Sequence, residues 1–172
     1  MAAITHRVAT ADTGNTPNTS GAIVPAVGDL LIVFVTKEAS ALSAPMASAD
    51  LTSSVAPTAF TLIRNQGHQA SAAHIGVFVA DGLTVNTTSR TVTIASGADA
   101  GAGTIIAVLS VSNMRKVGAS AVRQSAGQTD QAAGTPAPAF ALAALTTNPC
   151  VGAIYNATNP AGCRIGTAKW ET

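Results

Sequence analysis

Hydrophobic residues recur along this chain with the short period that is typical of β-strands. Residues 29–36 form an almost unbroken apolar run, with Phe34 among branched aliphatic side chains. The run is introduced by a turn signal, the Gly28–Asp29 pair. A run of this length bounded by turn residues predicts a buried strand. Residues 90–95 instead alternate Thr with Val and Ile, which predicts a strand with one solvated face and one buried face.

The same criteria predict further strands and almost no helix. Residues 39–49 are rich in Ala, but Pro45 interrupts them and Ser recurs, so at most a single helical turn fits there. The other predicted strands are apolar or alternating segments bounded by turn residues, at 59–64, 74–80, 104–112, 139–145 and 150–155.

The pattern predicts an all-β fold in a single domain. About eight strands, joined by small-residue loops and without a long amphipathic helix, indicate an antiparallel β-sandwich that is jelly-roll-like. A chain of 172 residues is long enough to build a core without a metal or a disulfide. We expect one sandwich domain over residues 1–172, with an N-terminal strand and extended arm in residues 1–26 and the sandwich proper in residues 27–172.

Two polar segments do not fit the predicted core. Residues 11–22 and 125–138 are rich in Gly, Asn, Gln and Pro, and they predict an extended arm and a long loop. Such segments contact partners in some proteins and are plain surface loops in others, and both interpretations stay open. Trp170 either docks on a neighbouring copy or covers the margin of the core. The candidate partner-binding residues are Asn15, Pro17, Asn18, Gln128, Asp130, Pro136, Pro138 and Trp170.

Charged and aromatic residues are scarce, and this narrows the possible functions. Charged residues make up 10% of the chain and aromatic residues 3%, and nine Lys and Arg against eight Asp and Glu leave a net charge of +1. The basic residues are scattered, with Arg115 and Lys116 as the single adjacent pair, so no nucleic-acid partner is expected. The weak net charge permits copies of the chain to associate with one another.

Neither a membrane span nor a secretion signal is expected. The longest strongly apolar runs are far shorter than the roughly 20 residues of a spanning helix. Polar residues follow Arg7, where a signal peptide would have its apolar segment. We therefore expect the chain to mature in a cytoplasm, where Cys150 and Cys163 stay reduced by default, with a disulfide after release into an oxidising medium as the alternative.

No group of residues has the spacing of a catalytic or metal site. His68 and His74 are six residues apart without a nearby carboxylate, which favours ordinary surface or strand-end histidines. The glycine-rich residues 97–103 lie between two predicted strands, so no helix N-terminus is available to hold a phosphate. The carboxylates are dispersed and the Gly-x-Ser-x-Gly motif of hydrolases is missing. We expect neither enzymatic activity nor a cofactor.

Several stretches together are similar to one group of viral proteins. Residues 27–35 read Val-Gly-Asp-Leu-Leu-Ile-Val-Phe-Val, in which a Gly-Asp-Leu-Leu run leads into an apolar strand. There follow in order a Thr-x-Thr-x-x-x-Gly segment at residues 91–97, an apolar strand ending in Val-Ser at residues 105–112, and an Asn/Pro/Gly-rich segment at residues 156–162 before Trp170. In this arrangement the chain resembles small jelly-roll structural proteins of tailed bacteriophages.

The resemblance implies a structural virion protein without catalytic residues, made in the host cytoplasm and located on the capsid surface. It implies a capsid decoration, or cement, protein that binds the outer surface of a tailed-phage head and stabilises it. The implied partners are the major capsid protein and further copies of the chain in a homotrimer. The alternative that the resemblance leaves open is a receptor- or glycan-binding jelly-roll module of a tail or fibre.

Overall fold

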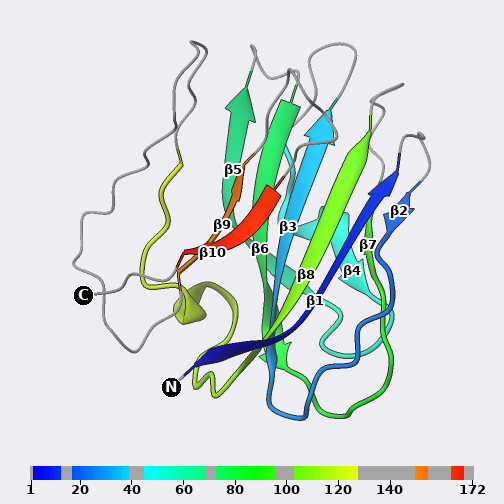
Figure 1. Cartoon of the computed structure of the whole chain (residues 1–172), viewed down its shortest axis with the longest axis vertical. Helices are drawn as coiled ribbons and strands as arrows, with labels where there is room; N and C mark the ends of the chain where they lie inside the picture. The colour runs from blue at the N-terminus through cyan, green and yellow to red at the C-terminus, as the bar shows by residue number, and fades with distance from the viewer. Residues whose placement is uncertain are drawn as a thin grey trace.

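The chain folds into an antiparallel β-sandwich, shown as a computed structural model in Figure 1. The structure describes residues 2–12, 17–38, 45–68, 73–95, 103–127, 150–154 and 164–168. The strands are β1 Ala3–Asp12, β2 Asn18–Thr19, β3 Leu30–Glu38, β4 Leu51–Ser53, β5 Phe60–His68, β6 Ala73–Leu83, β7 Val92–Ile94, β8 Thr104–Ser112, β9 Cys150–Ile154 and β10 Arg164–Ala168. Two short 3-10 helices, η1 Ser48–Asp50 and η2 Gly118–Ala121, precede β4 and follow β8.

Among the described residues, two sheets hold eight strands. The larger sheet has the order β1-β8-β3-β6-β5, the smaller sheet has the order β2-β7-β4, and every neighbouring pair is antiparallel. β9 and β10 pair with each other in a separate two-stranded ribbon. In Figure 1 this ribbon lies in front of the larger sheet, whereas β4 and β7 lie behind it.

The centre of the larger sheet is buried on both of its faces. Each residue of β3 from Leu30 to Thr36, and each of residues 106–111 in β8, is at most 9% exposed. Successive side chains of a strand point to opposite faces of a sheet, so continuous apolar runs fit strands that are covered on both sides. These two neighbouring strands therefore form the middle of the hydrophobic core.

Different elements cover the larger sheet. Leu51, Val92 and Ile94 of the smaller sheet are almost fully buried and belong to the same core as β3 and β8. Met114 and Val117, in the segment after β8, pack against the core as well. The η2 turn that ends this segment lies against β5 and β6. The two sheets and the segment after β8 thus pack around one core.

The antiparallel pairs are nested in the sequence. β1 pairs with β8, β2 with β7 and β3 with β6, so each pair encloses the next. Eight strands wrapped into two sheets in this way are typical of a jelly roll. β5 departs from this nesting, because it pairs along its length with β6 and not with β4. Its contact with β4 is one hydrogen bond just before β5 begins, which the Ser53 N–H donates to the Thr58 carbonyl (3.2 Å). The β-sandwich is confirmed, and the jelly-roll interpretation stays a prediction.

Most predicted strands are present with nearly the predicted bounds. β8 covers residues 104–112 as predicted, and β3, β5 and β6 each begin within one residue of the predicted start. In β7, Val92 and Ile94 are buried while Thr93 is half-exposed, which confirms the predicted alternation. The predicted strand at residues 139–145 lies outside the described residues. None of the helices in the described part is long and apolar enough to cross a membrane.

The segment predicted as an N-terminal arm is largely part of the sandwich. Ala11 and Asp12 end β1, and Asn18 begins β2. Asn18 is only 4% exposed, and its Nδ2 donates a hydrogen bond to the Thr104 carbonyl of β8 (2.8 Å). The prediction that Asn18 lies on an extended arm that faces a partner is therefore wrong, because this polar side chain satisfies a backbone carbonyl inside the fold.

Candidate functional site

Three exposed valines lie at one end of the sandwich, and we call them the valine tip. Val24 and Val27 belong to the connection between β2 and β3, Val85 follows β6, and their side chains are 52%, 63% and 67% exposed. The Gly28 N–H joins the two connections by donating to the Thr84 carbonyl (2.9 Å). These connections form the lower end of the sandwich in Figure 1. They are the large hydrophobic side chains that the described part of the chain leaves exposed, which makes them candidates for an interaction surface.

A buried carboxylate holds the connection that leads into β3. Gly28 has a φ of +84°, a left-handed conformation that glycine adopts without strain, and it turns the chain into the strand. Asp29 is 2% exposed, and its Oδ2 accepts hydrogen bonds from the Ala26 N–H (3.1 Å) and from the Ser110 hydroxyl. Asp favours turns because it makes such local bonds. Here the same side chain also fixes the turn to β8.

Thr84 ties the two connections of the valine tip to each other. Its hydroxyl donates to the Ala26 carbonyl and accepts from the Asp29 N–H (3.1 Å), and its own N–H donates to the Asp29 carbonyl (2.8 Å). Thr84 is 2% exposed, so these bonds form away from solvent. Buried polar groups that are satisfied in this way make a backbone rigid. Val27 and Val85 therefore project from a fixed frame.

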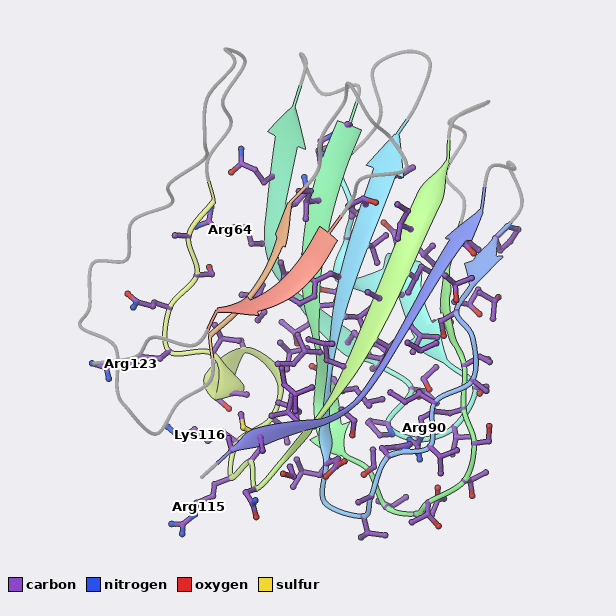
Figure 2. The ribbon with its side chains drawn as sticks, in the orientation of Figure 1. Arg64, Arg90, Arg115, Lys116 and Arg123 are labelled. Atoms are coloured by element: carbon purple, nitrogen blue, oxygen red, sulfur yellow. The ribbon has the colours of Figure 1, made fainter. Side chains whose placement is uncertain are left out.

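Arg90 is a buried cation that joins further connections at this end, where Figure 2 labels it. It is 1% exposed; Nη1 donates to the Ala56 carbonyl (2.7 Å), and Nη2 donates to the carbonyl and Oδ1 of Asn86 (3.1 and 3.0 Å). Its backbone pairs with Ile23 in both directions (2.9 and 3.0 Å). Burial lowers the pKa of Arg90, because desolvation disfavours the charged form. Arg90 thus binds the loops at Ala56 and Asn86 through its guanidinium, and it binds Ile23, next to Val24, through its backbone.

The surface of the valine tip is uncharged. The connections that carry the three valines, residues 23–29 and 84–91, and the adjoining residues 54–58 contain two charged residues, Asp29 and Arg90, and both are buried. A partner that binds here meets apolar side chains and neutral backbone, so binding desolvates little charge. The arrangement is suited to holding an apolar surface of complementary shape.

The structure places few of the predicted partner residues. Pro17 is exposed beside β2, whereas Asn18 is buried. The loop predicted at residues 125–138 is described only at its start, where Arg64 Nη2 donates to the Ser125 carbonyl (3.0 Å). The other predicted partner residues lie outside the described residues and stay predictions: Asn15, Gln128, Asp130, Pro136, Pro138 and Trp170.

The sequence pattern did not predict the valine tip. Val24 and Val27 stand beside Pro25 and Gly28, outside any predicted strand, and Val85 follows a strand that had been expected to end earlier. Valines between turn residues are the signal that was present in the sequence. Their exposure depends on which connections meet in the fold, and the local pattern does not contain that information.

The His74 ring is another polar group that bonds within the fold. His74 lies near the start of β6, but it is 3% exposed, and its Nδ1 is 2.9 Å from Asn65 Nδ2. Of the two positions predicted for His74, the strand end is confirmed and the surface is wrong, because the ring is buried beside Asn65 of β5. Within the residues that the structure describes, no three His, Cys, Asp or Glu side chains converge as a metal site would require.

The exposed basic residues of the described part lie in the segment after β8. Figure 2 shows Arg115 and Lys116 in the segment after β8 and Arg123 farther along the same segment, on the other side of the sandwich from Arg90. All three side chains are exposed. They follow one surface segment, which leaves β8 at the end of the sheet where β3 begins.

No protein-family model matches the chain, and neither a curated protein nor a solved structure matches it significantly. Its function is therefore inferred from its own residues.

Proposed function

We propose that this chain is a structural virion protein that decorates the outer surface of a tailed-phage head and stabilises it, with the valine tip in contact with the major capsid protein. The observation that carries the proposal is the exposure of Val24, Val27 and Val85 on a backbone held fixed by buried polar groups. The likeness of several sequence stretches to phage jelly-roll proteins supplies the identity of the partner.

The size of the valine tip suits a partner that offers many identical sites. Burying one fully exposed Val contributes about 1.5–3 kcal/mol, so three partly exposed valines contribute about 2–5 kcal/mol together. A contact of that strength alone corresponds to a dissociation constant of about 0.2 mM or weaker. Copies that are joined to each other gain avidity on a repeating shell, which makes a weak single contact sufficient. A homotrimer on the shell meets this requirement.

The buried polar groups also favour binding over catalysis. The Asp29 carboxylate and the Ser110 and Thr84 hydroxyls bond to one another or to backbone, and the Arg90 guanidinium bonds to loop oxygens. A catalytic group needs to face a substrate, whereas these groups are almost inaccessible to solvent. We therefore propose a non-enzymatic role.

Electron microscopy of phage heads that lack the protein, mixed with the purified chain, tests the proposal. Wild-type chain is expected to appear at symmetric positions on the shell. Val27→Asp and Val85→Asp place a charge in the proposed contact and should each weaken binding by about tenfold or more. Ala119→Asp changes an exposed residue of η2 and serves as the matched control, with binding as in wild type.

Two results contradict the proposal. Density confined to the tail points to the receptor-binding module instead, and wild-type binding by both valine variants removes the valine tip from the contact.

A further inference from the structure

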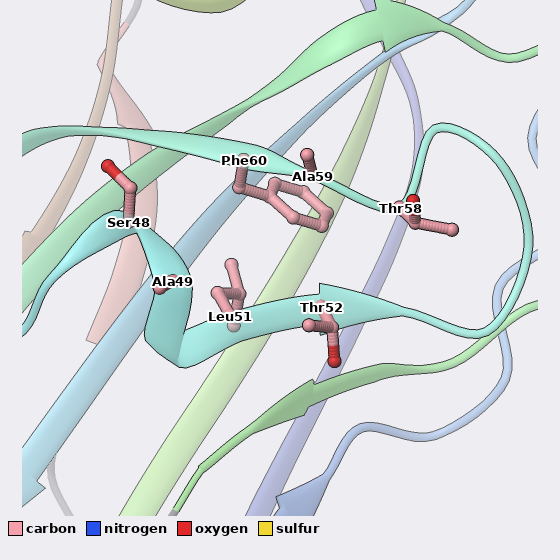
Figure 3. A pocket seen from close by; sticks show the side chains of 7 residues that line it. All are labelled: Ser48, Ala49, Leu51, Thr52, Thr58, Ala59 and Phe60. Atoms are coloured by element: carbon pink, nitrogen blue, oxygen red, sulfur yellow. The ribbon is translucent and has the colours of Figure 1, made fainter.

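A pit opens on the side of the sandwich between β4 and β5 (Figure 3). Its volume is about 420 Å³, and Leu51 and Phe60, 1% and 2% exposed, lie at its floor. Exposed small residues surround them, among them Thr52, Thr58 and Ala59. The lining carries no charged residue. The pit therefore suits a neutral, largely apolar group.

The pairing of β5 with β6 instead of β4 creates this pit. At one end the Ser53 N–H of β4 donates to the Thr58 carbonyl (3.2 Å). At the other end the Ser48 hydroxyl accepts from the Leu62 N–H of β5 (2.8 Å). The strand edges are linked at both ends, which leaves no open channel along which an added strand would lie. The space between the links fits one large side chain.

We propose that the pit binds the indole ring of Trp170 from a second copy of this chain. Trp170 is the only Trp of the sequence, and Lys169 and Glu171 flank it. A Trp side chain gains much from an apolar floor, because an aromatic ring of this kind buries about 150–250 Å². Its single N–H needs one acceptor, which the Thr58 hydroxyl offers at the rim.

The ring has to come from another copy because β10 ends too far from the pit for the two residues after Ala168 to span the separation. β10 ends at Ala168 and lies in front of that sheet in Figure 1, whereas β4 lies behind it. Stacked sheets are about 10 Å apart, so two layers separate β10 from β4 by about 20 Å. Two residues of chain reach about 7 Å at most.

This contact deepens the proposed function by naming a contact between copies, and it rests on that function for its place on the shell. The pit and Trp170 are different surfaces, so the interface is head-to-tail. A head-to-tail interface forms a closed ring when its rotation closes. Three copies related in this way form the homotrimer proposed above, with each Trp170 in the next pit.

Fluorescence of the full chain tests the contact, because Trp170 is the only Trp. Over a dilution series from roughly 0.1 to 200 µM, the emission maximum of the wild-type chain is expected to move to shorter wavelength as concentration rises, in step with the mass from light scattering. Ala59→Lys places a charge at the rim of the pit and should weaken association by about tenfold or more. Ala119→Lys, at an exposed alanine on η2, should associate as wild type.

A second variant examines the other half of the contact. Trp170→Ser should abolish association in light scattering, and Trp170→Phe should retain part of it because a smaller ring still covers the floor. The inference is overturned by a wild-type chain that stays monomeric with constant emission over the whole series, or by Ala59→Lys that associates like wild type.

Shell binding separates this inference from the proposed function. If wild-type copies bind shells but Ala59→Lys associates normally, the pit contact fails and the decoration role stands. If copies associate through the pit but do not bind shells, the decoration role fails and the pit contact stands.

Discussion

Around β3 and β8 the apolar side chains lie inside and the backbone pairs with itself, whereas at the valine tip the polar side chains lie inside and the apolar ones outside. Phe34 and Leu109 are each 2% exposed in the first region, while Val27 and Val85 are more than half exposed in the second. Burial of apolar area stabilises the first region. Hydrogen bonds that involve Asp29, Thr84 and Arg90 fix the backbone of the second region. Stability and binding therefore depend on different residues, and variants can separate them.

The largest expected effect is loss of stability from the core. Phe34→Ala removes an aromatic ring from the centre of β3 and leaves a cavity, which costs about 3–5 kcal/mol of unfolding free energy. Urea unfolding followed by circular dichroism measures this cost. A loss no larger than that of a surface substitution would show that the centre of the larger sheet is less tightly packed than the structure indicates.

A smaller and local effect is expected at the base of the valine tip. Arg90→Met keeps much of the side-chain length but leaves the Ala56 and Asn86 carbonyls without their donor. A hydrogen bond to a charged group contributes about 1.5–3 kcal/mol, and relief from burying the charge offsets part of its loss. Amide hydrogen exchange should become faster in residues 54–58 and 84–89 and stay unchanged in β3 and β8. Uniformly faster exchange would contradict the local role of Arg90.

The smallest effect on stability is expected from the valine tip itself. Val85→Ala shortens a side chain that is 67% exposed, so the unfolding free energy should change by no more than about 0.5 kcal/mol. Binding to phage shells should nevertheless weaken, because methyl groups leave the proposed contact. Thermal unfolding and shell binding measured on the same preparation check this pair of outcomes. A clear drop in melting temperature would place Val85 in the core instead.

The strands of the core could be predicted because their signal is local. β8 has the predicted bounds, and β3 begins one residue late, since a continuous run of branched aliphatic residues has few other stable arrangements in water. The short strands β2 and β4 have no comparable pattern, because two or three residues do not define a period. They form because the long strands place their backbone beside β7.

The surface could be predicted less well because it depends on contacts between distant residues. Asn18 looked like part of a polar arm, and its burial follows from a carbonyl at Thr104, which lies 86 residues later in the chain. The valine tip likewise requires Gly28 to meet Thr84. Such pairs arise from the strand order, and no motif in the sequence records that order.

The nested pairing of the strands also sets the order in which this chain is able to fold during synthesis. The β5–β6 hairpin is complete soon after Leu83 leaves the ribosome, but β1 pairs with β8 from Ala3 opposite Ser112. At about 5–20 residues per second, β1 waits roughly 5–20 seconds for its partner. During that interval it offers unpaired N–H and C=O groups to any extended chain nearby. Of the three nested pairs, β1 thus waits longest for its partner, and it is exposed to wrong pairing for the longest time.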